Sequence, residues 1–234
     1  MLSTDSLRVI NDIRDGLDEL ESALQNGLAS APEEALDPLV TALMALSGLS
    51  NESMIRGVGW RFMEIGRRLE RGMQIVTFIK TLLVPGLSDN DEPVVLSAML
   101  LTLEALITYR RRYRGRKNVA FGLELCLIDT SNPRSLMYQF ETLQKHVDNL
   151  PDVGVSSREL LSEQRIVFEA ISRIRLSRLV NLAEVNAESG ERESLEQTLS
   201  RSYQLLSDLG SVISDKYFDH RVEPQQLVRA VWEG

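Results

Sequence analysis

The chain has 234 residues, of which 43% are hydrophobic and 26% charged, so it can bury a sizeable core and does not have the composition of a disordered protein. Its formal net charge of -8 disfavours long-range attraction to nucleic acid or to anionic lipid. The single cysteine, Cys126, excludes an intrachain disulfide and favours a reducing, cytoplasmic setting.

The sequence shows no signal for membrane insertion or secretion. Its start, MLSTDSLRVINDIRDG, lacks the basic and apolar regions of a secretory signal. No stretch approaches the roughly 18 consecutive apolar residues that a membrane-spanning helix needs. We therefore expect no contact with the membrane interior.

Apolar residues recur at spacings of three and four along the chain, which is the pattern of amphipathic helices, and alternating strand patterns are absent. Breaks at Pro, Gly and polar clusters delimit eight predicted helices: about 3–28, 30–48, 51–83, 93–113, 118–127, 131–150, 156–187 and 191–218. Short polar connections favour antiparallel packing, so we predict an all-α fold, an elongated antiparallel bundle of about eight helices. We expect a single domain over residues 1–234, with 219–234 as a loosely ordered tail. An orthogonal packing of the helices is the alternative.

The helix predicted over 51–83 carries an apolar seam with heptad-like spacing: Val58, Phe62, Ile65, Leu69, Gly72, Val76, Ile79 and Leu83. Beside the seam, Gly59 and Gly66 predict a close approach by another helix. Charged residues occupy the rest of the helix, at about 100° per residue: Glu64, Arg67 and Arg71 opposite the seam, Arg61 and Arg68 on one flank, and Glu70 on the other. Such a face is either a solvated surface with weak ion pairs or a binding surface.

The segment Gly59–Gly72, GWRFMEIGRRLERG, resembles the hallmark of the bacterial alpha-E domain family, which is named for a Glu-Arg motif. Two further stretches fit the family in the same order, TYRRRY at 108–113 and DTSNPRSLMYQ at 129–139, and similarity extends diffusely from about Leu2 to Phe218. Full-length members carry an earlier helical segment with a first Glu-Arg motif, and nothing before Leu46 resembles it. The resemblance therefore implies that the chain corresponds to the C-terminal portion of the family domain.

Family members are found fused to, or encoded beside, circularly permuted ATP-grasp proteins and transglutaminase-like proteins. The resemblance thus implies a setting of amide or peptide bond formation, or of peptide modification, with an ATP-grasp-type ligase as a fused or separate partner. The chain itself has no Walker loop and no dinucleotide glycine fingerprint, so we expect no cofactor. His146 and His220 lie far apart without a ligand pattern, so no metal site is predicted. Cys126 stands among leucines and is interpreted as a buried thiol.

Two other segments hold candidate anion-binding groups. The end of the helix predicted over 93–113 is basic, with Tyr109 and Tyr113 one turn apart and six cations nearby: Arg110, Arg111, Arg112, Arg114, Arg116 and Lys117. These cations either bind a phosphate or carboxylate or complement the carbonyl groups of a helix end. Ser131, Asn132 and Pro133 are expected to cap and open the next helix, where Arg134 and exposed amides are also able to receive an anion.

We predict a non-catalytic helical module that presents a Glu/Arg cluster to an anionic substrate segment, such as a peptide, or to the ligase. The candidate binding residues are Arg61, Glu64, Arg67, Arg68, Glu70, Arg71, Tyr109, Arg110, Arg112, Tyr113, Asn132 and Arg134. Within this set, Arg67, Arg71 and Arg134 are expected to converge on one pocket, positioned by Glu64 and Glu70. One alternative is a scaffold or homo-oligomerisation bundle with internal ion pairs only. Another is an enzyme with Glu70 as general base.

Overall fold

The computed structural model describes residues 4–25, 32–114, 116, 118–151 and 159–218. Within these ranges the secondary structure is helical without a strand, apart from an isolated bridge between Pro85 and Glu191, which confirms the all-α prediction. The chain divides into two compact units, Met1–Trp60 and Arg61–Gly234. The single domain over 1–234 stays a prediction, and the predicted tail lies outside the described residues. None of the described helices is both long and apolar enough to cross a membrane.

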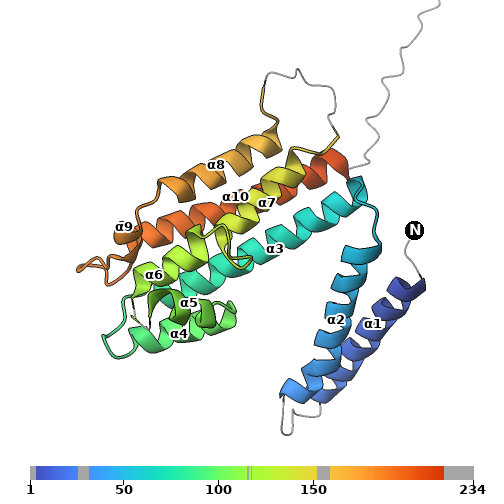
Figure 1. Ribbon diagram of the computed structural model, residues 1–234, viewed down its shortest axis with the longest axis horizontal. Coiled ribbons are helices and arrows are strands. Elements are labelled where there is room, and N and C mark those ends of the chain that lie inside the picture. The colour runs from blue at the N-terminus through green and yellow to red at the C-terminus, as the bar shows by residue number, and fades with distance from the viewer. Residues whose placement is uncertain (1–3, 26–31, 115, 117, 152–158, 219–234) are drawn as a thin grey trace, which may run out of the picture. The chain divides into compact units, whose positions relative to one another are not determined.

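The first unit is a helical hairpin. Helices α1 (Thr4–Gln25) and α2 (Pro32–Ser53) pack along each other (Figure 1). Gly16 of α1 faces Leu39 of α2, and a Cβ atom placed at Gly16 would lie in ordinary contact at 3.8 Å from the Cα of Leu39. The predicted end of the second helix near residue 48 is wrong, since α2 continues to Ser53. The following bend at 54–57, where the Gly57 N–H donates to the Ile55 carbonyl at 2.7 Å, delays the next helix to Val58.

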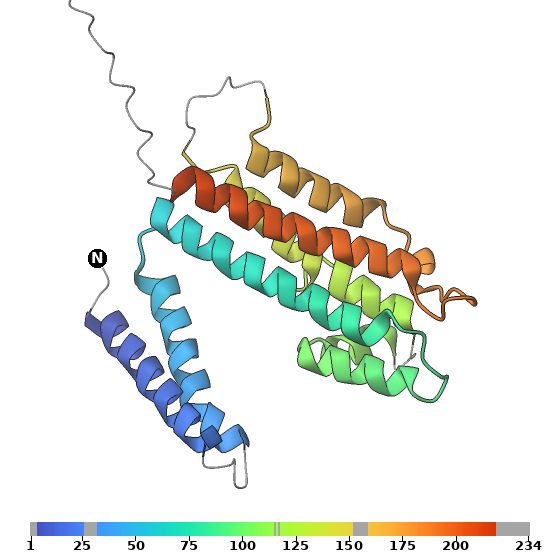
Figure 2. The ribbon, with the colours of Figure 1, turned by 180° about the vertical axis from the view of Figure 1, so that it is seen from behind.

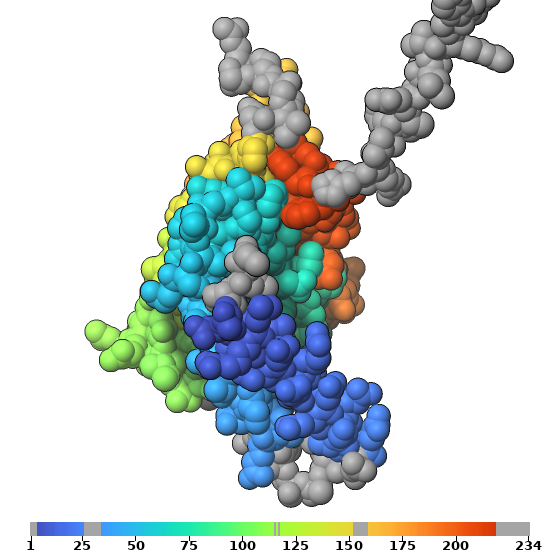
Figure 3. Space-filling view, turned by 90° about the vertical axis from the view of Figure 1, so that its right-hand side faces the viewer, coloured from blue at the N-terminus to red at the C-terminus, as the bar shows by residue number. Residues whose placement is uncertain are grey.

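Four long helices of the second unit form a bundle with a continuous apolar core (Figures 1 and 2). They are α3 (Val58–Leu83), α7 (Leu136–Val147), α8 (Ser162–Leu176) and α10 (Glu193–Tyr217). The first turns of α3 lie beside the last turns of α10 (Figure 3), where the rings of Phe62 and Tyr217 are 5.2 Å apart. The two helices are therefore antiparallel, which agrees with the predicted bundle.

The close approach on α3 occurs at Gly72. A Cβ atom there would lie only 3.0 Å from Cδ1 of Leu206 on α10, so glycine lets the two helices meet. The prediction for Gly59 and Gly66 is wrong, since no atom of another described helix lies within 4 Å of a Cβ placed at either position. The seam itself is buried at Ile65, Gly72, Val76, Ile79 and Leu83, while Val58 is exposed.

Shorter elements are packed at one end of this bundle (Figure 1): α4 (Glu92–Thr102), α5 (Leu106–Tyr113), α6 (Val119–Leu123), the π-helical turn η1 (Glu124–Ile128) and α9 (Leu179–Ala183). Two of the predicted long helices are divided. The helix expected over 93–113 breaks at Glu104, which adopts a left-handed conformation. The helix expected over 156–187 ends at Leu176, because Ser177 and Arg178 are extended, and its expected capping residue Ser156 lies outside the described residues.

Arg192 joins several of these elements at a buried position. It is 2% exposed, and its guanidinium donates to the carbonyl oxygens of Leu83 at 2.9 Å, Pro85 at 3.1 Å and Ala183 at 3.0 Å. It also pairs with the carboxylate of Glu92, in the first turn of α4. One side chain thus satisfies carbonyl groups at the ends of α3 and α9, which the sequence pattern did not indicate.

Candidate functional site

Glu64 lies at the base of the candidate site and is buried, being 4% exposed. Its Oε1 accepts a hydrogen bond from Arg67 Nη1 at 2.6 Å, and its Oε2 accepts one from Arg68 Nη2 at 2.8 Å. The prediction that Glu64 faces away from the packed side of its helix is wrong. The reason is that α7 lies against this side of α3, since Gln139 and Tyr138 of α7 contact Arg68 and the Glu64 charge acts on His146 of α7.

Gln139 of α7 links Arg68 to the neighbouring backbone. This buried amide donates from Nε2 to the carbonyl oxygens of Pro133 at 2.7 Å and Ser135 at 3.2 Å, and its Oε1 accepts from Arg68 Nη1 at 3.4 Å. The Arg68 guanidinium also lies 5.9 Å from the ring centroid of Tyr138. Arg68 Nε is buried and has no acceptor among the described residues, so this guanidinium keeps an unused donor.

Arg71 is the member of the site on which the charges of three other arginines act. It is half-buried, and no hydrogen bond or ion pair joins it to any described residue. Burial lowers the pKa of Arg71, the charges of Arg134, Arg68 and Arg67 lower it further, and only Glu104 acts in the opposite direction. We call the group Arg67, Arg68, Arg71 and Arg134 the arginine cluster, because the charges of the other three act on Arg71. The convergence of Arg67, Arg71 and Arg134 on one pocket stays a prediction.

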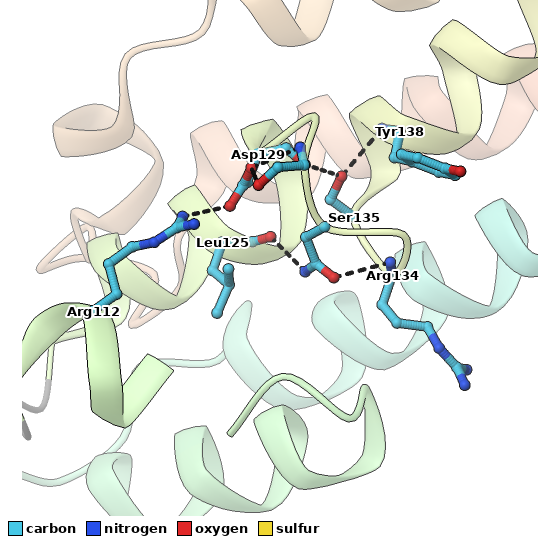
Figure 4. Close-up of polar contacts among 8 residues, drawn as sticks. Arg112, Leu125, Asp129, Arg134, Ser135 and Tyr138 are labelled. Carbon is cyan, nitrogen blue, oxygen red and sulfur yellow. Dashed lines mark hydrogen bonds and ion pairs between the residues drawn. The ribbon is translucent and has the colours of Figure 1, made fainter. Parts of the chain in front are cut away.

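Arg134 reaches the cluster from the loop before α7. Its Nη2 lies 2.8 Å from Oε2 of Glu104, and its backbone N–H donates to Oδ1 of Asn132 at 3.0 Å (Figure 4). The amide of Asn132 donates in turn to the carbonyl of Leu125 in η1 at 2.9 Å. Asn132 therefore uses both ends of its side chain to shape this loop.

Helix α7 begins later than predicted. Ser135 is its N-cap, since the Ser135 hydroxyl accepts from the Tyr138 N–H at 3.1 Å (Figure 4), and the first helical residue is Leu136. The expectation that Ser131 to Pro133 form the cap and first turn is wrong. The Asn132 side chain, bonded to the backbone two residues on, stabilises a turn in place of a helix.

Asp129 fixes the other side of this loop. Its carboxylate pairs with Arg112 of α5 and accepts hydrogen bonds from the Ser131 N–H at 2.8 Å and hydroxyl at 2.6 Å (Figure 4). Burial raises the pKa of Asp129, but the hydrogen bonds from Ser131 and Arg112 outweigh it, so the pKa lies below its usual value. Arg112, predicted as an anion-binding residue, is thus engaged within the protein.

The two predicted tyrosines of α5 hold the basic turn together. Tyr109 is buried, and its hydroxyl donates to the Arg116 carbonyl at 2.7 Å and accepts from the Asn118 N–H at 3.0 Å. Tyr113 stacks on Phe121 with ring centroids 4.6 Å apart. Their rings serve the packing of α5 against α6.

The remaining predicted residues differ in exposure. Arg61 is half-buried on α3, while Glu70 and Arg110 are exposed and form no ion pair with a described residue. Sequence reasoning missed Glu104, a carboxylate between apolar residues whose importance depends on a helix break that periodicity did not reveal. No three His, Cys, Asp or Glu residues of the described chain are grouped as a metal site requires.

A separate cavity lies between α3 and α10. Its volume is about 600 Å³, and it is lined in part by Thr77, Lys80, Glu196, Ser200 and Tyr203. Lys80 Nζ lies 2.9 Å from Glu196 Oε1. None of the lining residues belongs to the arginine cluster.

The chain is similar to a known protein family and to several proteins of mycobacteria. A family model described as a predicted alpha-helical domain with a conserved ER motif matches residues 1–218. The uncharacterized proteins Mb2597 of Mycobacterium bovis and MT2643 and Rv2567 of Mycobacterium tuberculosis are each 37% identical to the chain over 187 residues. These residues are 80% of this chain and 20% of each relative, so the chain spans about a fifth of the length of these relatives. No solved structure matches the chain.

Proposed function

Because this chain belongs to the Alpha-E family of α-helical domains, whose members share a Glu-Arg motif, we propose that it is a non-catalytic module that binds an acidic peptide segment through the arginine cluster. A carboxylate of the peptide takes the unfilled position beside Arg71. Guanidinium groups suit this task because they bind carboxylates through two parallel hydrogen bonds.

The observation that carries the proposal is the environment of Arg71. A half-buried guanidinium that three other arginines repel is unfavourable without an anion. Glu104, the carboxylate that acts on Arg71, is already paired with Arg134, and Glu64 is paired with Arg67 and Arg68. The donors of Arg71, which is only partly buried, are therefore available to a ligand, whereas the unpartnered Nε of Arg68 is buried.

The proposed partner is an ATP-grasp-type ligase, fused or separate, acting in the cytoplasm on amide or peptide bonds. This part of the proposal rests on the family context of the resemblance and on the absence of a nucleotide-binding motif in the chain itself. The correspondence of the chain to the C-terminal portion of the family domain belongs to the same proposal.

A scaffold function is the second candidate, and Glu64 favours it. Its carboxylate is buried and fully used by two arginines of its own helix, as expected of charges that fix helix packing. The two candidates differ in what Arg71 does. In a scaffold, Arg71 has no ligand and its loss leaves peptide binding unchanged, or lowers stability where its side chain contributes to packing, whereas in a binding site its loss weakens binding.

Peptide titration separates these functions. Isothermal calorimetry would compare an acetylated tetraglutamate peptide with its tetraglutamine counterpart on the wild type, on Arg71→Gln, and on Arg178→Gln, an exposed control with the same charge change. We expect only tetraglutamate to bind, and Arg71→Gln alone to weaken it by about tenfold, as for one lost charged hydrogen bond. Equal binding by both variants, together with a destabilised Arg71→Gln, would support the scaffold.

A further inference from the structure

Glu104 occupies a backbone position that favours glycine. Its φ of 53° is left-handed, and it follows the C-terminus of α4. The Glu104 N–H donates to the Leu101 carbonyl at 2.9 Å and the Ala105 N–H to the Leu100 carbonyl at 2.7 Å. This pair of bonds is the Schellman motif, whose left-handed residue is usually glycine because a Cβ atom is unfavourable there. A glutamate therefore stands at a position where its Cβ atom strains the backbone.

The strained residue directs its carboxylate toward the arginine cluster. Glu104 Oε2 lies 2.8 Å from Arg134 Nη2, and the Glu104 charge also acts on Arg71. Within the described chain, Glu104 and Glu64 are the two carboxylates that act on the cluster, and they occupy it differently. Glu64 is buried beneath the arginines, whereas the Glu104 side chain is 69% exposed and free to leave.

Stability does not explain this arrangement. An ion pair as exposed as that of Glu104 and Arg134 contributes little to folding, and glycine would remove the backbone strain. A non-glycine residue in a left-handed conformation at the edge of a cationic site is a reason to look for a functional role.

We propose that Glu104 is a tethered competitor for the anion site. In the free protein its carboxylate holds Arg134, and an acidic side chain of the bound peptide displaces it, taking over Arg134 while also filling the position beside Arg71. Because Glu104 holds the site with its own carboxylate, the ligand group that replaces it is also a carboxylate. The ligand has to displace Glu104, so Glu104 lowers the affinity with which the site binds it. This inference rests on the proposed function, because it requires the cluster to bind an anion.

Titrations of the tetraglutamate peptide into Glu104 variants test the competition. Glu104→Gln removes the charge and keeps the shape, Glu104→Gly removes the charge and the strain, and Glu188→Gln is an exposed control with the same change in net charge. We expect both Glu104 variants to lower the Kd about fivefold, the factor by which an exposed ion pair can hold the site closed, and Glu188→Gln to leave it unchanged.

Each outcome bears on a different part of the proposal. Equal or weaker binding by Glu104→Gln, with wild-type binding intact and Arg71→Gln impaired, would overturn the competitor role and leave the proposed function standing. Binding detectable only in the Glu104 variants would support both. If neither the wild type nor any variant binds tetraglutamate, the proposed function fails and the competitor role fails with it.

Discussion

Arg68 donates from Nη2 to Oε2 of Glu64 at 2.8 Å, and this carboxylate is nearly inaccessible to solvent. The same carboxylate accepts from Arg67, so one buried negative charge pairs with two arginines of its own helix. This buried carboxylate holds Arg67 and Arg68 and forms no pair with Arg71 or Arg134, so under the proposed function these two are the arginines that an outer anion binds.

Glu64→Gln should destabilise the protein by about 2 to 3 kcal/mol, because it leaves two partly buried guanidinium groups without their carboxylate. The partial exposure of both arginine side chains keeps the expected loss below that of a fully buried pair. Urea unfolding followed by circular dichroism would measure it. The control is Glu70→Gln on the exposed side of α3, which should cost less than about 0.5 kcal/mol. Equal losses for both variants would refute the buried role of Glu64.

Arg192→Met should destabilise by about 3 kcal/mol or more. The substitution keeps the volume of the buried side chain but leaves the carbonyl groups of Leu83, Pro85 and Ala183 without this donor. Arg111→Met, at an exposed position of α5, is the matched control and should have little effect. Thermal unfolding of the two variants would measure the difference. Similar melting temperatures would contradict the role of Arg192 as a buried donor to these carbonyl groups.

Asn132→Asp should cost about 1 to 3 kcal/mol and weaken peptide binding. Aspartate keeps the acceptor for the Arg134 N–H, but it cannot donate to the Leu125 carbonyl and places a charge against it. The loop that aims Arg134 at the cluster would then lose its anchor. Asn181→Asp, an exposed change of the same type, controls for charge. Unfolding and peptide titration together would show whether both effects occur.

Cys126 should be unreactive in the folded protein. Burial raises the pKa of its thiol to about 12, so almost no thiolate exists at neutral pH, and the sulfur is also inaccessible. Reaction with a chromogenic disulfide reagent should therefore be slow in buffer and fast in concentrated urea. Rapid labelling of the native protein would show that this part of the core opens readily.

Acidification should lower stability through His146. Burial lowers its pKa, Arg61, Arg68 and Lys145 lower it further, and Glu64 acts in the opposite direction. The unfolded chain therefore binds the proton first, near its ordinary pKa of about 6.5, so stability is lost as the pH falls below that value toward the folded pKa. Urea midpoints at pH 7.5 and 5.5 should differ more in the wild type than in His146→Gln. An equal pH effect in both proteins would exclude His146 as its source.

The helical fold could be predicted because it depends on local patterns. The seam of α3 follows from apolar spacing, and Ile65, Val76, Ile79 and Leu83 are indeed buried. Helix boundaries were predicted less well where side chains bond to the backbone. At Asn132 a side-chain turn replaced the first turn of a helix, and at Glu104 a left-handed residue divided one helix into two.

In the candidate site, too, residue types could be predicted from the sequence, whereas contacts between distant segments could not. The sequence pointed to Arg67, Arg71 and Arg134 as anion-binding groups, because arginine chemistry and the family resemblance are visible in the residues themselves. Sequence could not indicate that Glu64 is buried, since that depends on which helix covers its flank. It also could not pair Arg134 with Glu104 or assign Arg112 to Asp129, because these contacts join segments from different elements.

The sequence by itself therefore determined the helical character of the chain, the apolar seam of α3 and the supply of arginines, all of which depend on residue type and short-range spacing. Only the tertiary structure decided which arginines have a paired carboxylate. The pairing of charges depends on distances and burial between segments remote in sequence, and these distances separate Arg71, which has no bonded carboxylate within the described chain, from Arg67 and Arg68, which share Glu64.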